Sequence, residues 1–584
     1  MNAVSEGTLA SEVGCHLESI ICILETDGYC PPRVHFLAVW GVHPMYMEPG
    51  MRSSGPGCHA ADTGGWYAVR HMRKILATAV LAAACLTAAN TKKPKLVVAI
   101  VIDQFRYDYL TRFRAEYTGG LDRLLTQGAV FTDARYIHFP TVTSAGHATF
   151  LSGATPSVSG IAGNEWFDRD EGKRVTSVSD AATLLLGGVD PAAAGASPRR
   201  LLVGTIGDEI KMADGAKSKV IGISLKDRAA ILPAGHMANG AFWFDSASHG
   251  FVSSTYYFPE LPGWVSDFNA AHHGDQHRGE TWLGHKMPED LAGFYGDGTA
   301  SPFAASPFGN EIVELLAERA IEAERLGRHE TTDVLAISFS SNDVVGHEYG
   351  PYSPEVHDIS LRTDKLLEKL FLAIGRQVGL EDTLIVLTAD HGVAPTAQES
   401  EDRHMPGGRM PAATPRAAIQ NALVTRFGEG NWILGMYDLC VYLNRDLMAT
   451  KKLDPAEVDR VAAQGAYQVD HIARVYTREQ LSTGGVVGDD MSRRVMNGYN
   501  LRRGADLEIM PEPYWTIGSA NATHATTYSY DNHVPVIFLG PGIRAGEYDE
   551  PIAVNDIAAT LAAVLHVETP SGSVGRALTE MLAR

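Results

Sequence analysis

Three long apolar runs, each of which leads to an acidic residue, limit the possible folds of this chain more than any other feature. The runs span residues 95–103, 333–340 and 383–390, and the associated acids are Asp103, Asp343 and Asp390. Continuous apolar runs without alternation are typical of strands buried on both faces. In open α/β sheets, ligands bind beyond the carboxyl ends of such strands. The pattern therefore predicts a buried parallel sheet with acids gathered at one edge.

Helical patterns separate these runs. Ser353 followed by Pro354 predicts a helix start, because serine caps helices and proline fits the first helical position. One apolar face then follows at helical spacing, formed by Ile359, Thr363, Leu366, Leu370 and Ile374. Further patterns predict a helix over 312–324, a strand over 534–539 and a helix over 555–565. This alternation predicts a doubly wound α/β fold, with a largely parallel sheet and helices on both faces.

The rhythm of strands and helices is lost in two regions. Residues of about 230–305 are rich in Gly, His, Pro and aromatic residues, and residues of about 396–520 show little periodicity. We interpret both as insertions that cap the active face of one domain over 95–584.

The N-terminal part has the pattern of a targeting segment. Residues 72–89 have a basic start, a short apolar run and small residues at the end, which predicts a signal peptide and a periplasmic or secreted protein. Cys85 stands in a weak lipoprotein-processing pattern, so a lipid anchor is an alternative to release. We interpret residues 1–71 as a mis-assigned start, or else as a disordered extension.

The net charge of the chain limits the kinds of molecule that it can bind. Lys and Arg total 49 and Asp and Glu total 69, which gives a net charge of −20, without a long basic run. This excludes an extended nucleic-acid-binding surface. An acidic protein with an anionic substrate needs locally focused positive charge, which metal ions can supply.

The stretch from Phe139 to Phe167 has the features of a nucleophile segment. Pro140-Thr-Val-Thr143 precedes small residues and an apolar helical pattern, which predicts a hydroxyl at a helix N-terminus, where anions are favoured. Thr143 is the preferred nucleophile and Thr141 the alternative. Because threonine is a weak nucleophile, a base or a metal elsewhere must activate it.

Acids and histidines after the predicted strands form a candidate metal set. Its members are Asp103, Asp343 and His347 in D-V-V-G-H, Asp390 and His391 in D-H-G, and His524 in T-H-A. Three carboxylates and three imidazoles suit two zinc sites. His533 is the alternative to His524. His272, His273 and His277 lack further ligands, so we expect no third metal site there.

Together these motifs resemble the alkaline phosphatase superfamily. Pro140-Thr-Val-Thr143 is similar to the threonine-nucleophile segment of nucleotide pyrophosphatase/phosphodiesterases and of one alkaline phosphatase branch. Ser224-Leu-Lys226-Asp-Arg228 resembles the K-x-R element of the periplasmic, phosphate-irrepressible alkaline phosphatases. The ordered set covers residues of about 95–570.

The resemblance implies a role for each matching residue. Thr143 would form a phosphothreonine, Asn164 would bind a phosphoryl oxygen, and Lys226 and Arg228 would contact the substrate. Of two zinc ions per chain, the one that activates Thr143 would be held by Asp103, Asp390 and His391, and the other by Asp343, His347 and His524. Ala525 departs from the family, which usually has glycine after the last histidine.

These assignments predict hydrolysis of small phosphate monoesters. A phosphodiesterase or nucleotide pyrophosphatase on the same core is one alternative, and a non-catalytic phosphate- or metal-binding periplasmic protein is another. The sequence indicates neither the natural substrate nor the oligomeric state.

Overall fold

The three apolar runs form adjacent strands at the centre of the molecule. In this computed structural model, which describes residues 92–296 and 301–583, β1 (Leu96–Ile102) pairs with β13 (Asp333–Phe339) and with β14 (Thr383–Thr388). Both pairings are parallel, and every residue of the three strands is buried. The carboxyl ends of β1, β13 and β14 therefore meet at one edge of the sheet.

The central sheet has eleven strands in the order β22-β2-β21-β14-β1-β13-β8-β9-β10-β6-β7. The remaining strands are β2 (Ala129–Phe131), β6 (Ser179–Leu186), β7 (Ala194–Ala196), β8 (Val220–Ser224), β9 (Gly240–Asp245), β10 (Gly250–Ser254), β21 (Val536–Leu539) and β22 (Gly546–Tyr548). Strands β14, β1, β13, β8 and β9 run parallel. Antiparallel pairs flank them, including β21 on β14. The predicted α/β class with a largely parallel sheet is confirmed.

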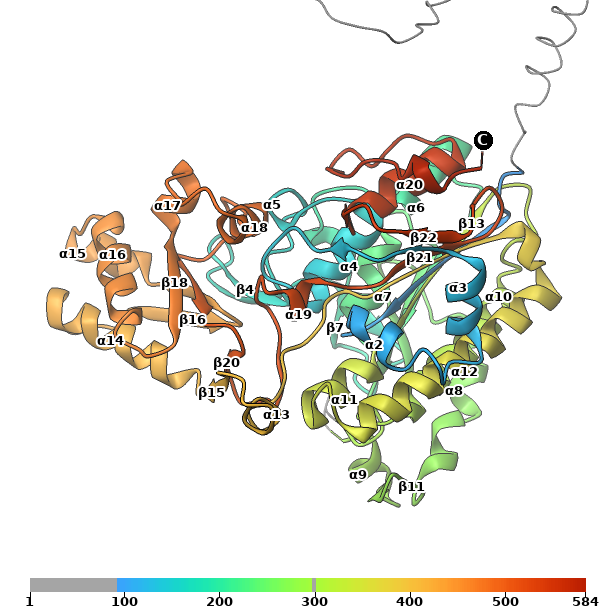
Figure 1. Ribbon diagram of the computed structural model, residues 1–584, viewed down its shortest axis with the longest axis horizontal. Coiled ribbons are helices and arrows are strands. Elements are labelled where there is room, and N and C mark those ends of the chain that lie inside the picture. The colour runs from blue at the N-terminus through green and yellow to red at the C-terminus, as the bar shows by residue number, and fades with distance from the viewer. Residues whose placement is uncertain (1–91, 297–300, 584) are drawn as a thin grey trace, which may run out of the picture. The chain divides into compact units, whose positions relative to one another are not determined.

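Two groups of helices cover the sheet. One comprises α4 (Thr143–Ser152), α6 (Ile206–Asp214), α7 (Asp227–Ala234) and α20 (Asp556–Leu565), and the other α3 (Gly120–Gln127), α10 (Pro307–Ala323), α11 (Ser341–Tyr349) and α12 (Pro354–Gln377). Contacts link the helices within each group, and the groups lie on opposite faces (Figure 1). As predicted, Ser353 caps α12, because its hydroxyl accepts a hydrogen bond from the Val356 amide.

The segment of about 230–305 is not wholly an insertion, which corrects the expectation from sequence. Its strands β9 and β10 extend the central sheet, with β9 parallel to β8. Only the part after β10, with α8 (Gly263–Ala270), the hairpin β11–β12 (Thr281–Trp282 and His285–Lys286) and α9 (Leu291–Tyr295), lies outside the sheet. Glycines at the start of both strands, Gly240 and Gly250, obscured them because glycine is typical of turns.

The segment of about 396–520 folds around a sheet of its own. The strands β16 (Ile433–Tyr437), β17 (Cys440–Leu443), β19 (Leu507–Pro511) and β18 (Ile472–Thr477) pair in that order, all antiparallel, beside α14 (Ala413–Phe427) and α16 (Pro455–Ala466). Through helix α18 (Asp490–Gly498), this segment forms hydrogen bonds with the part of the chain just before Thr143. The Phe139 amide donates to the Arg494 carbonyl at 3.0 Å, and Asn497 Nδ2 donates to the Ile137 carbonyl at 2.8 Å.

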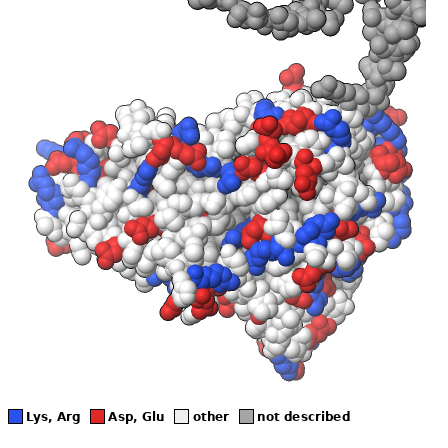
Figure 2. Space-filling view, in the orientation of Figure 1, with Lys and Arg blue, Asp and Glu red and all other residues white. Residues whose placement is uncertain are grey.

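Several expectations fall outside the described residues. These are the signal segment 72–89, the lipid attachment at Cys85 and the interpretation of residues 1–71. Among the helices that the structure does describe, none combines the length and the apolar character needed to cross a membrane. On the face drawn in Figure 2, basic and acidic side chains are interspersed.

A carboxylate from α12 caps the start of α3. The N-cap position, Gly119, has no side chain, and Asp364 supplies the missing acceptor. Asp364 is buried and accepts backbone hydrogen bonds from Thr118 at 3.0 Å, Leu121 at 2.7 Å and Asp122 at 3.3 Å. These bonds satisfy helix-terminal amides that have no partner within the helix.

We therefore expect Asp364→Ala to lower the free energy of unfolding by about 2 kcal/mol, because buried amides would lose a charged acceptor. Urea unfolding followed by circular dichroism measures the change. Lys365→Ala, which removes a neighbouring exposed side chain, is the control and should shift the free energy by less than about 0.5 kcal/mol. Equal shifts for the two variants would show that the cap contributes nothing specific.

Candidate active site

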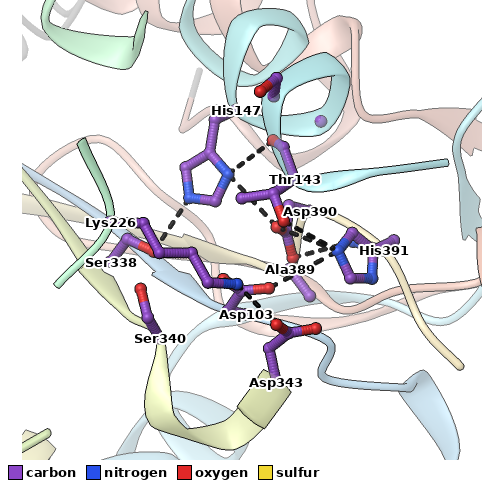
Figure 3. Close-up of polar contacts among 12 residues, drawn as sticks. Asp103, Thr143, His147, Lys226, Ser338, Ser340, Asp343, Ala389, Asp390 and His391 are labelled. Carbon is purple, nitrogen blue, oxygen red and sulfur yellow. Dashed lines mark hydrogen bonds and ion pairs between the residues drawn. The ribbon is translucent and has the colours of Figure 1, made fainter. Parts of the chain in front are cut away.

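The predicted acids converge where the central strands end. Asp103 directly follows β1, Asp343 lies in the first turn of α11 after β13, and Asp390 follows β14 (Figure 3). All three side chains are buried. Residues separated widely in sequence therefore come together because their strands are neighbours and run parallel.

His391 is the centre of one donor group. Its Nε2 lies 3.6 Å from Asp103 Oδ1, 3.4 Å from Asp390 Oδ2 and 3.5 Å from Thr143 Oγ1. Figure 3 shows these side chains pointing toward one another. The ring of His391 also stacks on that of His524, with centroids 3.5 Å apart.

Asp343 is the centre of a second donor group. Its Oδ1 lies 3.2 Å from His347 Nε2 and 3.8 Å from His524 Nε2. Donor atoms of Asp343, His347 and His524 all lie within 4.8 Å of one another, as do those of Asp103, Asp343 and His391. Asp343 thus belongs to both groups, while Asp390 adjoins the first group through His391.

Backbone carbonyls orient all three histidines in the same way. His347 Nδ1 lies 2.7 Å from the Ala522 carbonyl, His524 Nδ1 lies 2.7 Å from that of Thr141, and His391 Nδ1 lies 3.0 Å from that of Gly392. A carbonyl can only accept, so each Nδ1 carries the proton and each Nε2 keeps its lone pair for the site. Burial, with repulsion from His391 and His347, lowers the pKa of His524 well below its usual value, which keeps this imidazole neutral.

Lys226 enters between the carboxylates. Its Nζ lies 2.6 Å from Asp103 Oδ2 and 2.6 Å from Asp343 Oδ2. Burial disfavours the ammonium form, but attraction from the two carboxylates outweighs it and raises the pKa of Lys226. Burial and repulsion from Asp390 raise the pKa of Asp103 well above its usual value. Three buried acids around one ammonium leave the site in need of more positive charge.

The donor set fits divalent metal ions. Asp103 Oδ1 and Asp390 Oδ2 are buried and have no hydrogen-bond partner among the described residues. Unpaired buried carboxylate oxygens are costly unless a cation or donor satisfies them. Carboxylate oxygens combined with imidazole nitrogens are ligands of zinc and similar transition metals.

Thr143 stands at the start of α4, beside the His391 group. The preceding residue, Val142, caps the helix without a side-chain hydrogen bond, and the Ser144 amide donates to Asn164 Oδ1 at 2.9 Å. That bond leaves the Asn164 amide nitrogen as the group that can donate to a ligand. The hydroxyl of Thr141 instead donates to the Thr526 carbonyl at 2.8 Å, away from the donor groups.

Arg228 lies in the first turn of α7, two residues after Lys226. Its guanidinium is 3.6 Å from the carboxylate of its neighbour Asp227, and its buried Nε has no hydrogen-bond partner among the described residues. A cavity of about 300 Å³ runs beside both cations, and its lining includes Trp243 and Phe244.

The alternative ligands do not reach the site. His533 stacks on Tyr107 with ring centroids 4.4 Å apart, and its Nε2 bonds to the Thr132 carbonyl. His277 lies between Glu280 and Glu311, and no metal-binding group within 92–296 and 301–583 includes it with His272 and His273.

Alanine stands at position 525, where the family usually has glycine, and its backbone is unusual. Ala525 has a φ of 100°, a conformation that residues other than glycine rarely adopt. Despite this strain, the preceding residue, His524, holds its place in the site through the Thr141 carbonyl.

Two further residues contact the acids of the site. His147 bonds through Nδ1 to the Thr143 carbonyl at 2.9 Å and through Nε2 to Ser338 Oγ at 2.9 Å, with Nδ1 also 3.3 Å from Asp390 Oδ2. Sequence reasoning missed Gln104, whose backbone amide donates to Asp390 at 3.0 Å and whose Nε2 donates to Asp343 at 2.6 Å. A single glutamine after a strand carries no recognisable pattern.

The sequence of this chain is similar to a known family and to characterised proteins. Residues 97–533 match the model of the type I phosphodiesterase / nucleotide pyrophosphatase family. The alkaline phosphatase PafA of Elizabethkingia meningoseptica is 34% identical, over 84% of this chain and 95% of PafA. The alkaline phosphatase PhoV of Synechococcus elongatus is 35% identical, over 84% of this chain and 93% of PhoV.

Solved structures agree with the sequence comparison. The crystal structure of PafA superposes with a TM-score of 0.78 at 34% identity, over 84% of this chain and 99% of that one. A PafA variant in which a threonine, an asparagine, a lysine and an arginine are replaced superposes with a TM-score of 0.79 at 33% identity, with the same coverage. The chain therefore belongs to the type I phosphodiesterase / nucleotide pyrophosphatase family of the alkaline phosphatase superfamily, and it is a phosphatase.

Proposed function

We propose that this chain hydrolyses small phosphate monoesters through a covalent phosphothreonine at Thr143, with two zinc ions. The observation that carries the proposal is the position of the Thr143 hydroxyl, at the N-terminus of α4 and 3.5 Å from His391 Nε2. A nucleophile, a metal-ligand set and an anion-favouring helix end coincide at this point. The signal pattern of residues 72–89 supports action in the periplasm or outside the cell.

Thr143 and Asn164 bind and orient the phosphoryl group. The hydroxyl of Thr143 attacks phosphorus in line, and the amide nitrogen of Asn164 donates to a phosphoryl oxygen. Because the Ser144 amide fixes Asn164 Oδ1 at 2.9 Å, the donor is in place before substrate arrives. As the Thr143 oxygen bonds to phosphorus, the bond from phosphorus to the alcohol oxygen breaks, and the alcohol leaves after taking up a proton. Water then attacks the phosphothreonine, which releases inorganic phosphate and restores the Thr143 hydroxyl.

The ligand assignment follows from the two donor groups. Asp103, Asp390 and His391 lie beside Thr143 and would hold one zinc, and Asp343, His347 and His524 would hold the other. When bound, the two ions favour the ionised nucleophile and stabilise the departing oxygen. Gln104 and His147 keep the acids of both sets oriented.

Lys226 and Arg228 favour a monoester over a diester. A monoester presents two ionised non-bridging oxygens to this pair, whereas the second substituent of a diester removes one charge and obstructs contact. The four residues replaced in the PafA variant have the same spacing along the chain as Thr143, Asn164, Lys226 and Arg228, which supports these assignments. Diester hydrolysis on the same core is the second candidate function, because the matching family model includes phosphodiesterases.

The test compares an aryl phosphate monoester with the matching diester, using zinc-loaded enzyme. We expect a strong monoester preference in kcat/KM, and a loss of at least about 100-fold of monoester activity in the Lys226→Ala, Arg228→Ala double variant. Diester activity should change much less. Chelation of zinc and its restoration serve as the control for metal dependence. A preference for the diester in the unmodified enzyme would favour the second candidate.

Close backbone contact sets the position of Thr143. A Cβ at Gly146 would lie 2.3 Å from the Asp390 carbonyl oxygen and 2.7 Å from Asp390 Cβ. Only glycine lets α4 approach the Asp390 segment this closely. The separation between the Thr143 hydroxyl and the His391 group therefore depends on Gly146.

Accordingly, Gly146→Ala should push α4 away and lower monoester kcat/KM by about 100-fold, because small displacements of reacting groups have large effects. Steady-state kinetics measure the loss, and circular dichroism checks folding. Gly263→Ala is the matched control, since a Cβ there meets no atom within 4 Å. Activity of Gly146→Ala within about threefold of the unmodified enzyme would contradict this account of Thr143.

A further inference from the structure

The turn between β16 and β17 brings to the site an acid that the proposed mechanism does not use. Asp438 and Leu439 form this two-residue turn, and Asp438 has a φ of 50°. Aspartate tolerates this left-handed conformation better than most residues. The strand β16 packs against β4 (Glu165–Asp168), which begins immediately after Asn164 (Figure 1).

The Asp438 carboxylate lies against the backbone at Gly163, just before Asn164. Its Oδ2 is 3.9 Å from the position that a Cβ at Gly163 would take, one residue before Asn164. The side chain of Asp438 is exposed to solvent. A charged group contributed by the 396–520 segment thus stands beside the residue that we propose binds the phosphoryl group.

Active-site charges act on this carboxylate. Partial loss of solvent around the carboxylate and repulsion from Glu165 raise the pKa of Asp438 to about 6, while attraction from Arg228 and His347 opposes the rise. At neutral pH the group is mainly ionised.

A carboxylate in this position is unfavourable for the phosphate itself, since like charges repel. Among the described residues, no side chain forms an ion pair with Asp438 or donates a hydrogen bond to it. No residue within 92–296 and 301–583 thus neutralises its charge by direct contact. A positively charged group on the substrate would do so.

We propose that Asp438 contacts the alcohol portion of the substrate and selects monoesters whose leaving group ends in an ammonium. This inference rests on the proposed function. The phosphoryl group binds to Asn164, Lys226 and Arg228, and the ammonium end lies toward the β16–β17 turn. Glu165, although bonded to Arg174 at 2.6 Å, adds to the negative potential there.

The experiment compares 2-aminoethyl phosphate with propyl phosphate, which are similar in size and differ in terminal charge. The ratio of their kcat/KM values is measured for the unmodified enzyme, for Asp438→Asn, and for Asp470→Asn. Asp470 is an exposed acid of the same segment and controls for net charge. Asparagine retains the left-handed turn conformation, and circular dichroism checks folding.

In the unmodified enzyme we expect the ammonium substrate to be preferred, and in Asp438→Asn we expect the ratio to fall about three- to fivefold, as for an exposed ion pair. Asp470→Asn should leave the ratio unchanged. If Asp438→Asn lowers both activities equally, Asp438 positions Arg228 and the inference is wrong. An unchanged ratio with unchanged activities also overturns it. Failure of the unmodified enzyme to hydrolyse either substrate would overturn the proposed function as well.

Discussion

Three buried carboxylates repel one another at the centre of the site, and its geometry requires cations that offset this repulsion. Asp103, Asp343 and Asp390 are brought together because β1, β13 and β14 are adjacent and parallel. Lys226 lies 2.6 Å from two of these acids and offsets part of the charge. The unpaired oxygens of Asp103 and Asp390 show that one ammonium is not enough. The buried acids therefore need further positive charge, and the strand ends fix where a cation would lie.

The polar contacts around these carboxylates orient the side chains of the site. Backbone carbonyls fix the three histidines so that each presents Nε2. Gln104 links Asp390 to Asp343, and His147 joins the nucleophile helix to Ser338 of β13. The start of α4, the buried acids, the histidines and the central strands thus form one connected unit. Such preorganisation is what phosphoryl transfer requires, because catalysis there consists mainly of positioning and electrostatics.

The sequence was most informative where local pattern and global fold agree. The apolar runs, the acids at their ends and the Ser353 cap predicted the central strands and α12, because burial on both faces and helix capping leave direct sequence signals. It was least informative where composition hides structure, as in β9 and β10, or where a residue acts through tertiary contact alone. Gln104 and Asp438 have no motif, and their importance depends on which segments lie next to them.

The covalent role of Thr143 is the central claim, and trapping the intermediate tests it most directly. Enzyme mixed with an aryl phosphate is quenched in acid, digested and analysed by mass spectrometry with fragmentation. The account predicts one phosphoryl group on Thr143, absent in Thr143→Ala and retained in Thr141→Ala, whose lost hydroxyl faces the Thr526 carbonyl. Phosphorylation of another residue, or labelling that persists in Thr143→Ala, would contradict it.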